Sequence, residues 1–169
     1  ASSFRFDFSH FEKISENHLR EVEKLVNKLI RQDIGREEFR ELPIEEAKEM
    51  GAMALFGEKY GNTVRVIKYG DSVELCGGTH ATSTGRIGVF KIVSESAVAA
   101  GVRRIEAITG RHVESAMYFM EDQLKAIKQL LGNVPDAIKG LTKLLSENDT
   151  QKKALQEVAN ERVQNLKKA

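Results

Sequence analysis

Two side chains of types that bind zinc in proteins, those of Cys76 and His80, stand four residues apart in the sequence. Gly77 and Gly78 lie between them, and glycine leaves the backbone free to fold so that both side chains converge. A structural zinc site has four protein ligands, and a catalytic one has three plus water. The other histidines are scattered along the chain, at His10, His18 and His112. The spacing therefore predicts only part of a zinc site, formed by Cys76 and His80.

The same two residues allow two other interpretations. In the first, Cys76 is a buried cysteine in a glycine turn and His80 bonds to the backbone. In the second, Cys76 is a nucleophile with His80 as its base, although no acid that orients the histidine is evident in the sequence. The sequence leaves these interpretations open and assigns a catalytic role to no residue.

A second candidate site is basic. Between residues 86 and 111, five arginines and lysines face only Glu95 and Glu106, a local excess of three positive charges. Such an excess favours contact with phosphate groups. The candidate nucleic-acid-binding residues are Arg86, Lys91, Arg103 and Arg104. The alternative is that one of the two adjacent arginines pairs with Glu95 or Glu106 while the other lies in solvent.

Two modes of nucleotide binding find no support around these two candidate sites. Aromatic residues do not interleave with the basic ones, so base stacking is not indicated. The glycines at positions 77 and 78 fit neither a dinucleotide-binding pattern nor a Walker pattern, because they lack the strand-turn-helix context and the following Lys-Ser/Thr.

The elements that position these residues begin with two helices. Apolar residues recur at helical spacing from Ser15 to Asp33, and the hydroxyl of Ser15 suits an N-cap. Pro43 is placed to start a short helix over residues 44–48. The apolar stretch at residues 52–61 is expected to pack in the core ahead of a turn.

Stretches rich in β-branched residues predict four strands, at residues 63–67, 73–75, 87–93 and 102–108. Residues 69–72 and 99–101 join neighbouring strands as hairpins, with Gly70 supplying the left-handed backbone of a tight turn. Helices followed by hairpins indicate an α+β fold, with an antiparallel sheet packed against helices.

Beyond residue 110 the chain predicts a different kind of structure. The expected domains are residues 1–110 and residues 111–169, because glycine becomes rare and helix formers dominate after Gly110. Apolar residues continue at alternating spacings of three and four, at Met117, Met120, Leu124, Ile127, Leu131, Ile138, Leu141 and Leu145. Residues 132–135 interrupt them, which predicts a helical hairpin. The hairpin either packs on itself or serves as a dimerisation arm.

Composition excludes several classes of protein. The net charge of +1 over 169 residues excludes a polybasic or acidic tail as the organising feature. With 41% hydrophobic and 30% charged residues, the chain has the composition of a globular protein. One cysteine cannot form an intramolecular disulfide, and no apolar run is long enough to span a membrane. We expect a cytoplasmic protein with neither a membrane nor DNA as partner.

Four motifs in order carry a resemblance to a known family. They are R-F-D-F-S-H-F at residues 5–11, G-A-M-A-L-F-G-E-K-Y at 51–60, E-L-C-G-G-T-H at 74–80, and S-E-S through G-V-R-R-I-E-A-I-T-G between 94 and 110. Together they resemble the editing domain of alanyl-tRNA synthetases. The resemblance covers about residues 4–110, and the helical tail is similar to the start of the dimerisation region that follows editing in that family.

The resemblance implies hydrolysis of tRNA(Ala) mischarged with serine or glycine, in an enzyme that ligates alanine to tRNA(Ala) with ATP. It implies tRNA(Ala) as partner, a homodimer through the tail, and zinc held by Cys76, His80 and two histidines of an upstream H-x-x-x-H motif. That motif is not found in the sequence, so we expect a half-site that binds zinc weakly and does not deacylate alone. The alternatives are a non-catalytic module for tRNA binding and dimerisation, and a freestanding deacylase.

Overall fold

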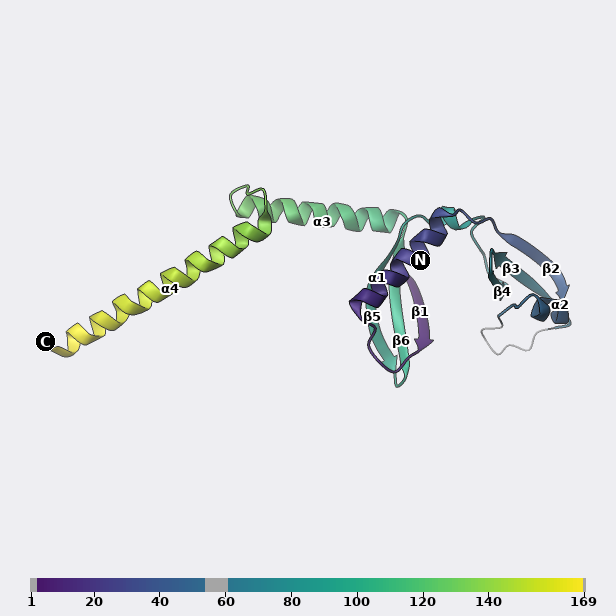
Figure 1. Cartoon of the computed structure of the whole chain (residues 1–169), viewed down its shortest axis with the longest axis horizontal. Helices are drawn as coiled ribbons and strands as arrows, with labels where there is room; N and C mark the ends of the chain where they lie inside the picture. Colours follow the sequence, from purple (N-terminus) through teal and green to yellow (C-terminus); the bar gives the residue numbers. More distant parts are fainter. Residues whose placement is uncertain (1–2, 54–60, 169) are drawn as a thin grey trace. The chain divides into compact units, whose positions relative to one another are not determined.

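The computed structural model describes residues 3–53 and 61–168 (Figure 1). The chain divides into two compact units, Ala1–Ser115 and Ala116–Ala169. The expected core-packing segment at residues 52–61 lies mostly outside the described residues. The α+β class and the helical tail predicted from the sequence are confirmed.

One sheet of the first unit carries the region around Cys76. Its strands are antiparallel in the order β2 (Glu37–Pro43), β3 (Thr63–Tyr69) and β4 (Ser72–Leu75). The short helix α2 (Ile44–Glu49) follows Pro43 directly. A core forms from alternate strand residues and the helix, namely Ala47, Val64, Val66, Val73 and Leu75. Since side chains alternate across a strand, the opposite face receives the residues between them.

The other sheet orders its antiparallel strands β1 (Phe4–Ser9), β6 (Val102–Thr109) and β5 (Phe90–Ala99). The helix α1 (Glu16–Arg31) begins where the sequence predicts, with the Ser15 hydroxyl accepting a hydrogen bond from the His18 N–H. A 3-10 helix, η1 (Thr84–Ile87), precedes β5. Both expected hairpins are present, and Gly70 and Gly101 have φ of +58° and +71°.

The sequence predicted one sheet of four strands, whereas residues 3–53 and 61–168 form two sheets with six strands in total. The first missed strand, β1, does alternate, with Phe4, Phe6 and Phe8 on one face. The second, β2, is mostly charged and contains a bulge, so its composition did not indicate a strand. The strand expected from residue 87 begins at Phe90 instead, because residues 84–87 form η1.

Side chains of α1 cover the free edge of β5. The side-chain amide of Asn27 donates to the Phe90 carbonyl at 2.8 Å and accepts from the Phe90 N–H at 2.9 Å. Glu23 accepts from the Ile92 N–H at 3.0 Å and pairs with Lys91. Because an open strand edge invites pairing with another chain, these contacts both anchor the helix and protect the sheet.

We expect Asn27→Ala to lower the free energy of unfolding by about 1–3 kcal/mol, since it leaves the Phe90 N–H and carbonyl without partners in a half-buried place. Chemical denaturation of the chain measures the loss. Lys24→Ala, an exposed change on the same helix, is the matched control and is expected to have little effect. Equal effects of the two changes would show that the edge contacts contribute nothing.

The second unit contains most of α3 (Arg111–Leu130) and all of α4 (Ala137–Lys168). The interruption predicted between them is confirmed, with φ of +82° at Gly132 and +60° at Asn133. Asp136 caps α4, because its carboxylate accepts from the Ile138 and Lys139 N–H groups.

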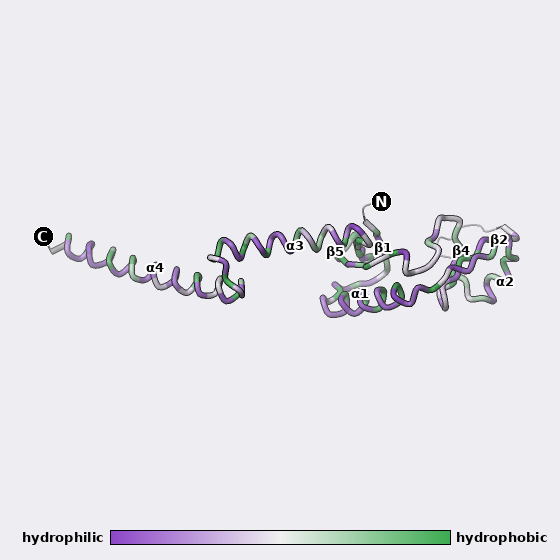
Figure 2. Tube along the Cα trace, turned by 90° about the horizontal axis from the view of Figure 1, so that it is seen from above, coloured by the Kyte–Doolittle hydropathy of each residue, from purple (hydrophilic) through white to green (hydrophobic). Residues whose placement is uncertain are grey.

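The apolar stripe of the tail is exposed in this chain. Apolar and polar residues alternate along both helices (Figure 2), and the stripe side chains from Met117 to Leu166 that are exposed range from 44% to 79%. The two predicted helices are present, but of the two alternatives for the tail, a hairpin packed on itself does not fit this exposure. Among the described residues, no helix combines the length and apolarity needed to cross a membrane.

Candidate functional site

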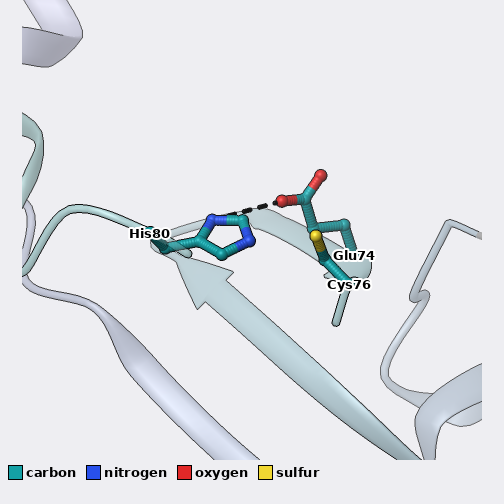
Figure 3. A group of neighbouring side chains, drawn as sticks. All are labelled: Glu74, Cys76 and His80. Carbon is teal, nitrogen blue, oxygen red and sulfur yellow. Dashed lines mark ion pairs between the residues drawn. The ribbon is translucent and has the colours of Figure 1, made fainter. Parts of the chain in front are cut away.

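Three side chains converge where β4 ends. Figure 3 shows the side chains of Glu74, Cys76 and His80, whose ligand atoms all lie within 4.8 Å of one another. The convergence of Cys76 and His80 on one loop at a sheet edge was predicted, and the structure confirms it. Glu74 is an addition that the sequence analysis missed.

Strand alternation explains why Glu74 joins the site. Val73 and Leu75 of β4 point into the core, so Glu74 lies on the opposite face and Cys76, two residues on, follows it there. The chain then returns through Gly77–Thr79 to bring His80 back beside them. The signal was present in the sequence as a carboxylate two residues before the cysteine.

The ring of His80 is held with one nitrogen available. Its side chain is 15% exposed, and Nδ1 lies 3.5 Å from the nearer carboxylate oxygen of Glu74 (Figure 3). Its other nitrogen, Nε2, is buried and has no hydrogen-bond partner among the described residues. A buried nitrogen without a partner is costly unless something binds it. The interpretation in which His80 bonds to the backbone through its ring is thus not supported.

The sulfur of Cys76 also has a polar neighbour. The Gly78 N–H donates to Sγ at 3.4 Å, a contact that suits a thiolate. An added Cβ at Gly78 would lie 3.4 Å from the same sulfur, so a side chain there would crowd it.

The donor set fits zinc. Thiolate sulfur and imidazole nitrogen are its usual ligands, and a carboxylate beside the second ring nitrogen is a common way to fix the tautomer of a ligating histidine. Within the described part of the chain, these three residues are the group suited to a metal. They supply two or three of the four ligands that a structural zinc site needs.

The nucleophile interpretation also changes. The expectation that no acid orients His80 is wrong, because Glu74 lies beside Nδ1. However, no hydrogen bond joins Cys76 to His80 among the residues described, and a cysteine nucleophile needs its base within reach.

A cavity of about 830 Å³ adjoins His80. Its walls are mainly apolar and come from Val26, Leu29 and Ile30 of α1 and from Tyr69 of β3. The Tyr69 hydroxyl donates to the Ala81 carbonyl, and burial raises the pKa of this tyrosine. Apolar cavities with a few polar groups are the usual form of a small-molecule site.

Most of the basic candidates are engaged in ion pairs. Lys91 pairs with Glu23 at 3.0 Å. Arg103 makes a two-pronged contact with Glu95 at 2.5 and 2.6 Å. The fourth candidate, Arg86 in η1, makes no ion pair with any residue that the structure describes.

Arg104 makes a second two-pronged contact, with Asp7 at 2.6 and 2.7 Å. The alternative interpretation is therefore right for Arg103, which pairs with Glu95, and wrong in placing the other arginine in solvent, because Arg104 pairs with Asp7. The missed strand β1 explains the error, because it brings Asp7 opposite Arg104.

These ion pairs predict that the folded state becomes less stable at acidic pH. Hydrogen bonds from Arg103 lower the pKa of Glu95, against the opposing effect of burial, and Arg104 lowers the pKa of Asp7 in the same way. A lowered carboxyl pKa stabilises the folded state above the usual pKa of about 4, and this contribution is lost as the pH falls through the lower folded value.

We therefore expect the unfolding temperature to fall as the pH drops below about 4, and Glu95→Gln to weaken that dependence while lowering stability at pH 7. Thermal unfolding between pH 7 and pH 2 measures both. Glu12→Gln, at an exposed position, serves as control. An unchanged pH profile in the Glu95 variant would contradict the expectation.

Comparison with known proteins finds relatives of this chain. A family model described as the threonyl and alanyl tRNA synthetase second additional domain matches residues 64–106, which include the converging loop. The chain is 57% identical over 165 residues to an alanine–tRNA ligase of Porphyromonas gingivalis, covering 98% of this chain and 19% of the relative. An alanine–tRNA ligase of Bacteroides thetaiotaomicron is 52% identical over the same shares, and one of Cytophaga hutchinsonii is 51% identical over 99% of this chain and 19% of its own.

The chain thus spans about a fifth of the length of the curated relatives it matches. Similarity extends over nearly all of it, including the helical tail that the domain match leaves out. Over nearly its whole length, the chain therefore corresponds to the part of alanine–tRNA ligases that carries the second additional domain.

Proposed function

We propose that this chain carries part of the editing domain of an alanyl-tRNA synthetase, that the complete domain hydrolyses Ser-tRNA(Ala) and Gly-tRNA(Ala), and that the chain alone does not. The enzyme as a whole ligates alanine to tRNA(Ala) with ATP and works in the cytoplasm. The observation that carries the proposal is the convergence of Cys76 Sγ with a buried, unpartnered His80 Nε2 inside the segment that matches the family.

In this proposal Cys76 and His80 hold zinc, together with two histidines of an upstream H-x-x-x-H motif. The Glu74 carboxylate, 3.5 Å from Nδ1 of His80, would favour the tautomer with its proton on Nδ1 and so leave Nε2 free to ligate the metal. When bound, zinc supplies either activation of the attacking water or a fixed anchor for the amino acid of the substrate. The Gly78 N–H stabilises the negative charge on sulfur.

The need to remove serine follows from the weak selectivity of small apolar pockets. Such a pocket rejects a ligand with an added hydroxyl only weakly, so a synthetase for alanine admits serine. A second site that binds the hydroxyl can reverse the preference. The cavity beside His80 has the polar groups and the volume for a small amino acid ester.

Contacts to tRNA(Ala) are proposed for Arg86, Lys91, Arg103 and Arg104. Arg86 is the strongest of the four, since the others already pair with carboxylates of the described chain. A homodimer through the exposed stripe of the tail is proposed on the same footing, because an apolar stripe at heptad spacing needs a partner to be buried.

Release of serine from Ser-tRNA(Ala) tests the proposed function. A complete alanyl-tRNA synthetase that contains this chain is expected to hydrolyse Ser-tRNA(Ala) and spare Ala-tRNA(Ala), and to lose this activity with its zinc. Binding of tRNA(Ala) without hydrolysis would favour the non-catalytic module instead. Hydrolysis that survives removal of zinc but not the alkylation of Cys76 would favour a cysteine nucleophile.

A further inference from the structure

Two arginine side chains donate hydrogen bonds to the backbone of the converging loop, residues 76–80. The Nη1 of Arg65, on β3, donates to the carbonyls of Cys76 at 2.8 Å and Gly78 at 2.6 Å. The Nη1 of Arg36, just before β2, donates to the carbonyl of His80 at 3.0 Å. Three carbonyls of a five-residue loop therefore accept hydrogen bonds from charged side chains, which are about twice as strong as neutral ones.

A single carboxylate joins the two arginines. One oxygen of Glu38 accepts from the Nε of Arg65 at 2.8 Å, and its other oxygen lies 3.3 Å from Nη2 of Arg36. The Glu38 side chain is 14% exposed and both arginine side chains are 25% exposed. A guanidinium presents its donors in a rigid fork, so Glu38 fixes the donors that face the loop.

The fold puts these residues together through the register of β2 and β3. Glu38 pairs with Ile67 of β3, two residues from Arg65 and on the same face. A bulge then sets Arg40 and Glu41 of β2 opposite Arg65 alone, with Glu41 at φ of +56°. Arg36 is itself fixed, because its N–H donates to the Thr82 carbonyl just after the loop.

We propose that Arg36, Glu38 and Arg65 are positioning residues that hold the Cys76–His80 loop in the shape in which its two metal-binding side chains converge. The proposal rests on the proposed function for the role of the metal, but the loop contacts themselves are properties of this chain. None of the three residues touches Cys76 Sγ or the ring of His80 in the hydrogen bonds of the structure; they act through the backbone.

Arg40 provides a matched control. Its Nε also bonds to Glu38, at 2.8 Å, but its side chain is 78% exposed and it makes no hydrogen bond to the loop among the described residues. Arg40→Gln and Arg65→Gln therefore each remove a positive partner of the same carboxylate, and only the second removes the contact with the loop.

The first experiment uses the 169-residue chain without metal. Amide hydrogen exchange of Cys76 and Gly78, whose N–H groups have acceptors in the structure, is expected to speed up at least tenfold in Arg65→Gln and in Glu38→Gln, and to stay unchanged in Arg40→Gln. Arg65→Lys keeps the charge but cannot donate to two carbonyls and to Glu38 at once. Its exchange rate is therefore expected to lie between those of Arg65→Gln and the unmodified chain.

The second experiment uses a complete synthetase that contains this chain, loaded with cobalt or zinc. The sulfur-to-cobalt charge-transfer band is expected to shift or weaken, and zinc affinity to fall by about 10- to 100-fold, in Arg65→Gln and Glu38→Gln. Arg40→Gln is expected to match the unmodified enzyme. Unfolding temperatures of all variants separate a local effect on the loop from a general loss of stability.

Two results would decide against the proposal. Exchange and zinc affinity that respond equally to Arg40→Gln and Arg65→Gln would show a general charge effect. Unchanged exchange in Arg65→Gln and Glu38→Gln would show that the loop holds its shape without them. A third result would separate the two proposals. If the unmodified enzyme bound no zinc, but exchange were still faster in Arg65→Gln and Glu38→Gln, the proposed function would be contradicted and the role of the loop contacts would stand.

Discussion

Replacing Cys76 by alanine in a complete synthetase that contains this chain is expected to lower zinc affinity by at least about 100-fold. Loss of a partner outside the ligand shell already costs about 10- to 100-fold, so loss of a ligand costs at least as much. Hydrolysis of Ser-tRNA(Ala) is expected to fall with the metal, while charging of tRNA(Ala) with alanine continues. Metal analysis after dialysis and serine release from Ser-tRNA(Ala) measure the two effects.

Gly77→Ala is the control for this change. It alters the same loop, but an added Cβ meets no heavy atom within 4 Å and φ at Gly77 is outside the left-handed region. It is expected to keep the zinc and the activity. Full zinc retention in Cys76→Ala would mean that sulfur is not a ligand, and hydrolysis that persists after zinc is lost would separate the metal from the reaction.

The core of the candidate site was predictable because it is local. Cys76 and His80 are four residues apart, and a strand end with two glycines after it leaves few arrangements in which they do not meet. Glu74 belongs to the same local pattern, since strand alternation places it with Cys76 once Val73 and Leu75 are assigned to the core.

The surroundings of the site were not predictable, because they depend on pairing between distant segments. Glu38 and Arg65 are brought together by the pairing of β2 with β3, and β2 has a charged sequence whose composition does not indicate a strand. The partner of Arg104 is likewise almost a hundred residues away, on β1. Charge counts along the sequence cannot identify such partners, so the free positive charge of residues 86–111 was overestimated.

In the tail, the sequence predicted the helices but not their packing. Its two helices and the break between them follow from local signals, spacing by threes and fours and a Gly-Asn-Val-Pro connection. Packing does not follow, because an apolar stripe specifies that something covers it and not which surface does. The stripe from Met117 to Leu166 is an example, because its spacing predicted the helices but its side chains are exposed in this chain.

Zinc affinity is expected to rise by at least about a thousandfold when the chain is extended upstream to include the histidine pair of the H-x-x-x-H motif. Four protein ligands hold structural zinc with roughly 10–16 kcal/mol, and Cys76 with His80 supply half of them. Titration against a competing chelator compares the 169-residue chain with the extended one. Replacing both upstream histidines by alanine in the extended chain is the control and should return the affinity to that of the shorter chain.

Glu74 determines how this comparison can fail. If its carboxylate ligates the metal, the 169-residue chain already has three donors and binds zinc nearly as tightly as the extended chain. Glu74→Gln would then release zinc from the shorter chain. If Glu74 instead orients His80 through Nδ1, the same change weakens zinc binding about 10- to 100-fold in the extended chain, because the ligand stays but loses the carboxylate that orients it. Tight zinc binding by the shorter chain, lost in Glu74→Gln, would overturn the half-site and assign the carboxylate as a ligand.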